Sequence, residues 1–310
     1  MHAALVAGEP AIEREGAPSS SAESLLEIDA NEFRTCFDRR PFLIGHHLAD
    51  HPLFALPRLM QLSKTLPAEN VEYNAGNIPI CLAPELTPRN GLSADETIRR
   101  IAECKSWLVL KYVEHDPDYR ALLHRCLEEV RVHSDALHPG MCMAQAFVFI
   151  TSPGSVTPYH MDPEHNFLLQ IRGSKRISMF DPRDRSLLSD EELERFYDGA
   201  HRNMVFKEEY QKKAWQYELT PGLGLHFPVT APHYVQNGPE VSISFSITFR
   251  TRATERRETL YQVNHSLRGR GWRPTPVGAS RLRDTIKFNG YRILRRTRGL
   301  RSLVSQKPSN

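Results

Sequence analysis

Two patterns of apolar residues divide this chain of 310 residues. In residues 25–135, apolar side chains return at helical spacing, as Leu123, Leu127 and Val130 do. This spacing predicts amphipathic helices. The region is therefore expected to be largely helical, with short strands at residues 41–44 and 107–113.

After residue 135 the pattern changes to short apolar or alternating runs, separated by glycine, proline and asparagine. Such runs are typical of antiparallel strands, and their number predicts a barrel or jelly roll. The runs are Met141–Thr151, Asn166–Ile171, Lys175–Phe180, Trp215–Leu219, Leu223–Phe227 and Val241–Phe249. One helix interrupts them, because Ser189 and Glu192 have the spacing of a capping box.

These patterns predict an α+β fold with four parts. Residues 1–24 are small, polar and aperiodic, and we expect them to be disordered. Residues 25–135 would form a helical region packed on the core, residues 136–250 the β core, and residues 251–310 a basic helical extension. The dipeptide Asn289-Gly290 predicts a break in the last helix.

Composition indicates an ordinary globular protein of the cytoplasm. The chain contains no run of about eighteen apolar residues, so no transmembrane helix is expected. Residues 1–24 lack the basic and apolar segments of a secretory signal. The five cysteines are scattered, odd in number and without a Cys-x-x-Cys pair, so we expect reduced thiols rather than disulfides or a zinc site.

Positive charge is concentrated at the C-terminal end. Residues 250–310 hold 16 Lys and Arg against 3 Asp and Glu, a net charge of +13, whereas residues 1–249 have a net charge of −10. Three interpretations stay open. The segment packs on the domain or on the second subunit of a homodimer, it contacts an anionic surface such as lipid, or it binds nucleic acid. The last is the least favoured, because no recognised nucleic-acid-binding motif is present.

His160 and Asp162 are the first candidates for a metal site. Two residues apart on an extended segment, their side chains point to the same side. A second histidine would complete the two-histidine, one-carboxylate set of non-haem Fe(II) oxygenases. His233 is the favoured second histidine, and His226 is its rival, expected instead to be a core or pocket residue. His165 has no partner at metal spacing and is expected at the pocket rim.

Three further residues could bind a dicarboxylate cosubstrate. Lys175 follows a turn at residues 172–174, and a hairpin there would return its ammonium group to the metal site, where it could hold a carboxylate. Thr157 lies three residues before His160 and offers a hydroxyl to the same carboxylate. Asn166 offers an amide close to the metal.

The central stretch resembles a known family. Its residues are Thr157-Pro158-Tyr159-His160-Met161-Asp162, then Asn166-Phe167, Gln170-Ile171, Gly173 and Lys175-Arg176. They resemble the cupin-like branch of the Jumonji C (JmjC) 2-oxoglutarate oxygenases, and within it the type that hydroxylates an asparagine of hypoxia-inducible factor. The resemblance covers roughly residues 140–250.

The resemblance implies a double-stranded β-helix (cupin or jelly-roll) core and a set of residue roles. It implies that His160, Asp162 and His233 ligate Fe(II). It implies that Thr157 and Lys175 bind the C5 carboxylate of 2-oxoglutarate, with Asn166 near the cosubstrate. Where the family has an asparagine on its last core strand, this chain has Ser244, Ser246 and Thr248.

The expected function is that of an Fe(II)- and 2-oxoglutarate-dependent dioxygenase, which uses O2 and hydroxylates a peptide side chain or a small molecule. Hydroxylation is favoured over histone demethylation, because the chain has no chromatin-reading zinc module. The alternatives are a non-catalytic metal-binding cupin that acts as a sensor or scaffold, and a metal-dependent isomerase. Neither alternative explains Lys175.

Overall fold

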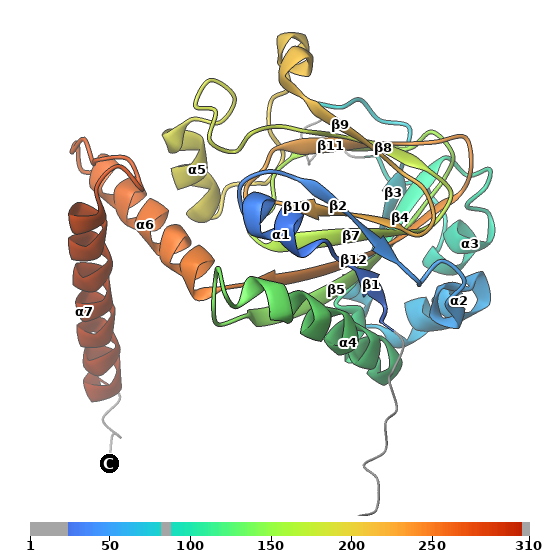
Figure 1. The fold of residues 1–310 in the computed structure, drawn as a ribbon, viewed down its shortest axis with the longest axis horizontal. Helices are drawn as coiled ribbons and strands as arrows, with labels where there is room; N and C mark the ends of the chain where they lie inside the picture. The colour runs from blue at the N-terminus through green and yellow to red at the C-terminus, as the bar shows by residue number, and fades with distance from the viewer. Residues whose placement is uncertain (1–23, 82–87, 306–310) are drawn as a thin grey trace, which may run out of the picture.

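The computed structural model of this chain describes residues 24–81 and 88–305. The predicted disorder of residues 1–24 therefore lies outside the described residues, except for Ser24. Two antiparallel β-sheets face each other (Figure 1). This arrangement confirms the predicted α+β fold with a jelly-roll core.

The larger sheet has eight strands in the order β1-β2-β10-β7-β12-β5-β4-β3. Their bounds are β1 Leu26–Glu27, β2 Phe42–His46, β3 Val71–Ala75, β4 Ser106–Lys111, β5 Cys142–Thr151, β7 His165–Arg172, β10 Leu223–Phe227 and β12 Ser242–Arg250. The smaller sheet has the order β6-β11-β8-β9. Its strands are β6 Val156–His160, β8 Lys175–Met179, β9 Trp215–Leu219 and β11 His233–Asn237.

The region before residue 136 supplies strands as well as helices. β1 and β2 extend one edge of the larger sheet, and β4 and β3 extend the other. The helices of this region contribute buried residues to one apolar core with that sheet. They are α1 Ala30–Cys36, α2 Leu56–Thr65, α3 Ala94–Arg99 and α4 Pro117–Ser134, with 3-10 turns at Pro52–Phe54, Ala68–Asn70 and Val113–His115.

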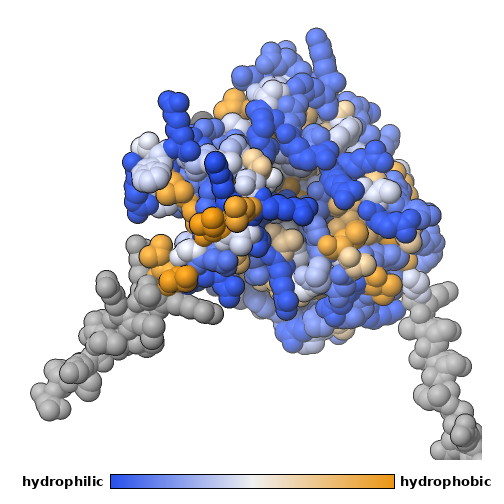
Figure 2. Space-filling view, turned by 60° about the vertical axis from the view of Figure 1, so that its left-hand side comes forward, coloured by the Kyte–Doolittle hydropathy of each residue, from blue (hydrophilic) through white to orange (hydrophobic). Residues whose placement is uncertain are grey.

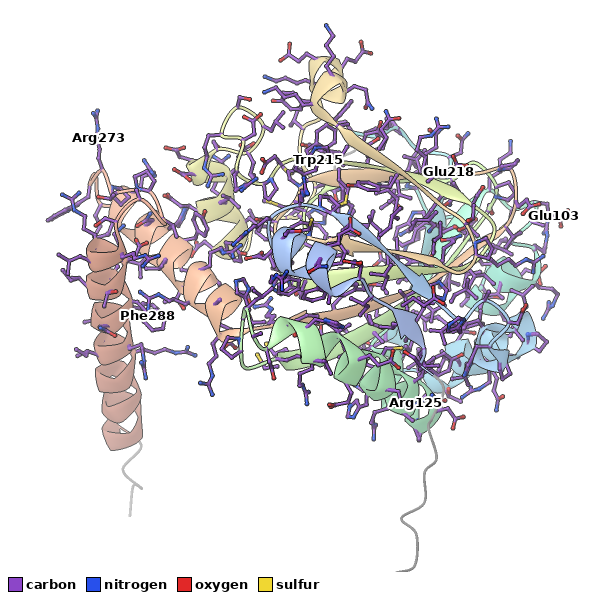
Figure 3. All side chains as sticks on the ribbon, viewed as in Figure 1. Glu103, Arg125, Trp215, Glu218, Arg273 and Phe288 are labelled. Carbon is purple, nitrogen blue, oxygen red and sulfur yellow. The ribbon has the colours of Figure 1, made fainter. Side chains whose placement is uncertain are left out.

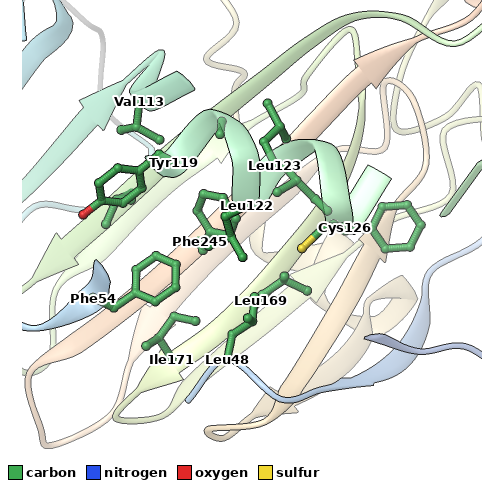
Figure 4. Close-up of a cluster of buried hydrophobic side chains, with 14 of the residues drawn as sticks. Leu48, Phe54, Val113, Tyr119, Leu122, Leu123, Cys126, Leu169, Ile171 and Phe245 are labelled. Carbon is green, nitrogen blue, oxygen red and sulfur yellow. The ribbon is translucent and has the colours of Figure 1, made fainter. Parts of the chain in front are cut away.

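Helix α4 forms where the helical pattern predicts it. Asp116 accepts a hydrogen bond from the backbone N–H of Asp118 at 3.0 Å, and Pro117 occupies the first turn. The buried face of α4 carries Leu122 and Cys126, which lie over the strands of the larger sheet (Figure 4). This burial holds the helix against the sheet's outer face.

The larger sheet buries both of its faces at its centre. Along β7, Phe167 and Leu169 belong to the core beneath the helices. Leu168 between them belongs to a second cluster, shared with the smaller sheet. Because side chains alternate along a strand, Asn166 lies on the same inner face as Leu168. The site described below lies between the two sheets.

Three helices follow the first strands of the core. α5 Asp190–Tyr197 begins with the predicted capping box of Ser189 and Glu192, and a 3-10 turn spans Glu208–Lys213. α6 Arg252–Arg268 and α7 Arg281–Ser305 form the C-terminal extension, at the edge of the molecule (Figure 1).

The predicted break at Asn289-Gly290 is wrong, since α7 runs through both residues without interruption. A glycine inside a helix costs only about 1 kcal/mol relative to alanine. Contacts of Lys287 and Phe288 with α6 hold the helix directly before that position. Within the described residues, none of the helices is long and apolar enough to cross a membrane.

Candidate metal centre and cosubstrate pocket

His160, Asp162 and His233 come together as the sequence predicts. β6 ends at His160 and β11 begins at His233, and the two residues are paired across these antiparallel strands. One ligand atom from each of the three side chains lies within 4.8 Å of the others. Asp162 Oδ2 is 3.6 Å from His160 Nε2 and 3.7 Å from His233 Nε2.

Backbone carbonyls orient both histidines. His160 Nδ1 lies 2.7 Å from the carbonyl oxygen of Pro158, and His233 Nδ1 lies 2.9 Å from that of Ala231. If each Nδ1 donates its proton to the carbonyl, the lone pair of each Nε2 faces the site. Burial lowers the pKa of His160, and it lowers the pKa of His233 to about 3. Neutral imidazoles beside a carboxylate fit a divalent ion such as Fe(II).

Arg202 holds the third member of the set. Its Nη1 donates to Asp162 Oδ1 at 2.8 Å, so Asp162 Oδ2 is the oxygen nearer the two histidines. Burial by itself raises the pKa of Asp162, but its electrostatic interactions with His160, Arg202 and His233 outweigh burial and hold this pKa below its usual value. The carboxylate therefore stays charged.

The position of Arg202 is fixed by backbone pairing. The carbonyl oxygen of Arg202 accepts from the Met161 N–H at 3.3 Å, and Asn203 forms an antiparallel bridge with His160. Sequence reasoning did not find Arg202, because nothing in its local sequence connects it to Asp162. The loop that brings it there follows α5.

Lys175 is buried on the same face of the smaller sheet as His233. Met179 pairs with His233 and Lys175 with Asn237, and residues at every second position of β8 share a face. The side chain is 5% exposed, and burial lowers its pKa to about 7. Within the described ranges no acidic group or hydrogen-bond acceptor pairs with its amine. An unpaired buried amine is suited to bind an anion.

Thr157 and Asn166 lie on the two sheets that enclose the site. Thr157 pairs with Val235 and so shares its inner face. Asn166 lies on β7, where its Oδ1 accepts from Ser246 Oγ at 2.8 Å. In the part of the chain that the structure describes, the Thr157 hydroxyl and the Asn166 amide nitrogen have no protein partner. Both donors are available to a ligand.

The serines of β12 form hydrogen bonds with polar side chains of β7, which the sequence alone did not predict. Ser246 fixes the Asn166 amide, and Ser244 Oγ donates to Gln170 Oε1 at 2.7 Å. Gln170 in turn donates to Ser242 Oγ at 3.0 Å. In place of one asparagine, β12 presents a row of small hydroxyl side chains that hold polar groups of β7.

His165 and His226 lie away from the metal centre. Both side chains are completely buried on the outer face of the larger sheet, where His165 stacks on Phe37 at 4.4 Å and His226 on Phe42 at 4.8 Å between ring centroids. The expectation of His165 at the pocket rim is wrong, because its position on β7 points it to the helices. His226 is a core residue, which leaves His233 as the histidine beside Asp162.

The model of the cupin-like domain family matches residues 97–255, about half of the chain. The chain is also similar to Jumonji C domain-containing protein 5 of Drosophila melanogaster, with 36% identity over 99 residues, 30% of this chain and 25% of that protein. Lysine-specific demethylase 8 of Danio rerio is 28% identical over 102 residues, 31% of this chain and 24% of that protein. These alignments cover about a quarter of the length of each relative.

The solved structures to which this chain is similar include ycfD from Escherichia coli, at 16% identity and a TM-score of 0.49, covering 86% of this chain and 67% of that chain. A second is the same organism's ribosomal oxygenase YcfD in complex with cobalt and 2-oxoglutarate. It has 14% identity and a TM-score of 0.49, with 92% of this chain and 69% of that chain covered.

Proposed function

The chain belongs to the family of cupin-like domains, and we propose that it is an Fe(II)- and 2-oxoglutarate-dependent dioxygenase that hydroxylates a peptide side chain or a small molecule. One observation carries the proposal. Two histidines and a carboxylate converge at one end of the smaller sheet, while the unpaired, buried amine of Lys175 lies on the same inner face. One dicarboxylate could therefore bind a metal ion at one end and the Lys175 amine at the other.

His160, Asp162 and His233 would hold the metal. Bound Fe(II) would supply, with 2-oxoglutarate and O2, the oxidising chemistry that hydroxylates an unactivated C–H bond and releases succinate and CO2. The protein's own contribution is to fix the ligand atoms. The carbonyls of Pro158 and Ala231 orient the imidazoles, and Arg202 sets which oxygen of Asp162 faces them.

Lys175 and Thr157 would bind the far carboxylate of 2-oxoglutarate. Because burial holds the pKa of Lys175 at about 7, an arriving carboxylate would raise this pKa and keep the amine charged. Asn166, held by Ser246, would direct its amide nitrogen to the cosubstrate near the metal. These groups orient the cosubstrate without contacting the C–H bond that reacts.

The alternative of a metal-binding scaffold is less well supported. A scaffold has no use for a buried amine without a partner, since such a group costs stability unless an anion is bound. Similarity to proteins named for a Jumonji C domain also supports an oxygenase. All five cysteines are free thiols, which supports a reducing compartment such as the cytoplasm.

The decisive test is cosubstrate binding and turnover by the purified chain. With Fe(II) present, wild type should bind 2-oxoglutarate in anaerobic calorimetry and convert it to succinate in air. His160→Ala and Asp162→Ala should abolish both the binding and the turnover of 2-oxoglutarate. The control His124→Ala, at an exposed site, should retain both. Metal binding without any binding of 2-oxoglutarate would instead establish the scaffold.

The substrate requires a separate experiment. Extracts incubated with wild type or with Asp162→Ala can be compared by peptide and metabolite mass spectrometry. A mass gain of one oxygen atom that depends on the active protein would identify the substrate. Loss of a methyl group in place of this gain would show demethylation and contradict the proposed hydroxylase.

A further inference from the structure

Helix α7 is fixed to the molecule through one of its sides. Lys287 Nζ donates to Asn264 Oδ1 of α6 at 2.8 Å, and the Arg256 guanidinium lies 5.0 Å from the centre of the Phe288 ring. Figure 3 shows Phe288 on this helix, in the space between α7 and α6. The buried Asp284 accepts from the Gly278 N–H at 2.8 Å. One side of α7 is therefore occupied.

Helix α6 connects α7 firmly to the core. Arg268 Nε donates at 2.8 Å to Glu194 of α5, a side chain only 1% exposed. At the other end of α6, Arg257 pairs with the buried Asp38. The C-terminal extension is thus a defined part of the fold, and the orientation of α7 is set by these contacts.

The opposite side of α7 is apolar and exposed. Leu282 is 72% exposed, and Ile286 and Ile293 are each 63% exposed. At 100° per residue these three positions lie within about 40° of one another on the helix surface. Asp284 and Phe288 lie on the other side. The aliphatic stripe therefore faces away from α6, and the expectation that the apolar side packs on the domain is wrong for these residues.

Arginines border this stripe on both sides. Arg283 and Arg292 are exposed, and by helical geometry they flank the stripe to its two sides. Over Arg281–Ser305 the sequence has eight Lys and Arg and a single acidic residue, Asp284, which is buried. Figure 2 shows this side of the molecule, where hydrophobic residues stand among strongly hydrophilic ones.

The aliphatic stripe and its flanking arginines together indicate which kind of partner can bind α7. A second copy of α7 would bring two strongly positive helices together, which is unfavourable. Nucleic acid would satisfy the arginines, but it offers no apolar surface for Leu282, Ile286 and Ile293. The surface of a bilayer that contains anionic lipid provides both acyl chains and phosphates.

We propose that α7 binds the surface of an anionic lipid bilayer, with its axis in the membrane plane. Leu282, Ile286 and Ile293 enter the boundary of the acyl chains, and Arg283 and Arg292 contact lipid phosphates. The rest of the chain stays on the aqueous side, because α6 holds the opposite side of α7. This inference is independent of the proposed oxygenase activity.

Vesicle flotation with the full chain tests the proposal. The protein should float with vesicles of phosphatidylcholine mixed with phosphatidylglycerol and stay behind with phosphatidylcholine alone. Each basic residue near an anionic surface strengthens binding roughly fivefold, so Arg283→Glu/Arg292→Glu should weaken it at least about tenfold. Ile286→Asp/Ile293→Asp should do the same by opposing insertion, and high salt should release wild type.

Matched controls separate α7 from general surface effects. Val132→Asp places one aspartate at a 78% exposed apolar residue of α4, as the control for the single variant Ile293→Asp. Arg172→Glu/Lys212→Glu makes the same charge change as the double arginine variant, at exposed positions elsewhere. Both should float like wild type, and circular dichroism checks that every variant is folded. Equal loss in the controls, or no flotation of wild type, would overturn the proposal. Self-association abolished by Ile293→Asp, or tighter binding to single-stranded RNA than to vesicles, would overturn it as well.

Discussion

Arg202 donates a hydrogen bond from Nη1 to Oδ1 of Asp162 at 2.8 Å, while Oδ2 of the same carboxylate lies 3.6 Å from His160 Nε2. The two oxygens therefore have different roles. One is held by a half-exposed arginine, and the other is directed to the candidate metal position. A group that orients a ligand in this way commonly affects metal affinity by 10- to 100-fold.

Arg202→Gln should consequently weaken metal binding by about tenfold or more. Titration with Mn(II), used in place of Fe(II), followed by calorimetry gives the affinity. Arg183→Gln is the control, since Arg183 pairs with Asp181 and has no contact with the metal ligands. If the two variants bind Mn(II) as tightly as wild type, Arg202 does not orient Asp162.

Lys175 should make cosubstrate binding depend on pH. Without a ligand its pKa is about 7, and a bound carboxylate raises it. Above pH 7 the free protein must therefore take up a proton when 2-oxoglutarate binds, and affinity should fall by up to about tenfold per pH unit. Calorimetry in buffers of different ionisation enthalpy measures the proton uptake.

Lys175→Met should remove both the proton uptake and most of the affinity. A hydrogen bond to a charged group contributes about 1.5–3 kcal/mol, which corresponds to a loss of roughly 10- to 100-fold. The neighbouring exposed Arg176→Met is the control. Unchanged 2-oxoglutarate affinity in the Lys175 variant would exclude its assigned role.

Ser246→Ala should weaken 2-oxoglutarate binding by about fivefold, because one hydrogen bond of about 1 kcal/mol no longer fixes the Asn166 amide. Metal affinity should not change, since Ser246 is not among the ligands. Ser244→Ala is a close control on the same strand face, where its hydroxyl bonds Gln170 instead. Equal effects on cosubstrate affinity in both variants would mean that the serines act only on stability.

His165 and His226 should make the fold sensitive to acid. Burial holds the pKa of both side chains well below its usual value, and all four ring nitrogens lack partners among the described residues. In the unfolded chain both titrate near pH 6.5. The unfolded state therefore binds protons that the folded state does not, so stability is full above about pH 6.5 and is lost as the pH falls below it.

The expected loss is about 1 kcal/mol per histidine between pH 6.5 and 5.5. Urea unfolding at several pH values measures it, and His226→Phe should reduce the slope by one proton while keeping the ring contacts with Phe42. His124→Gln, at an exposed site of α4, is the control for the loss of a histidine elsewhere in the chain. A pH dependence that is the same in wild type and His226→Phe would show that His226 is not buried in its neutral form.

Much of the core and the candidate site could be predicted from local sequence. The spacing of His160 and Asp162 places both on one side of an extended segment, and the turn at residues 172–174 returns Lys175 to it. The short apolar or alternating runs predict β7, β10 and β12, because glycine, proline and asparagine mark where each run ends. Local geometry of this kind needs no knowledge of distant residues.

Tertiary structure alone decided those contacts between distant residues that no motif marks. Arg202 reaches Asp162 through a loop that pairs with β6, and no local pattern encodes such a pairing. Residue spacing shows which side chains of β7 share a face, but not which face the helices cover. The burial of His165 against Phe37 could therefore not be predicted from spacing. The same holds for α7. Its sequence determined an apolar stripe bordered by arginines. That the stripe faces outward was decided only by the tertiary structure, because α6 packs against the opposite side of α7 and leaves the stripe exposed.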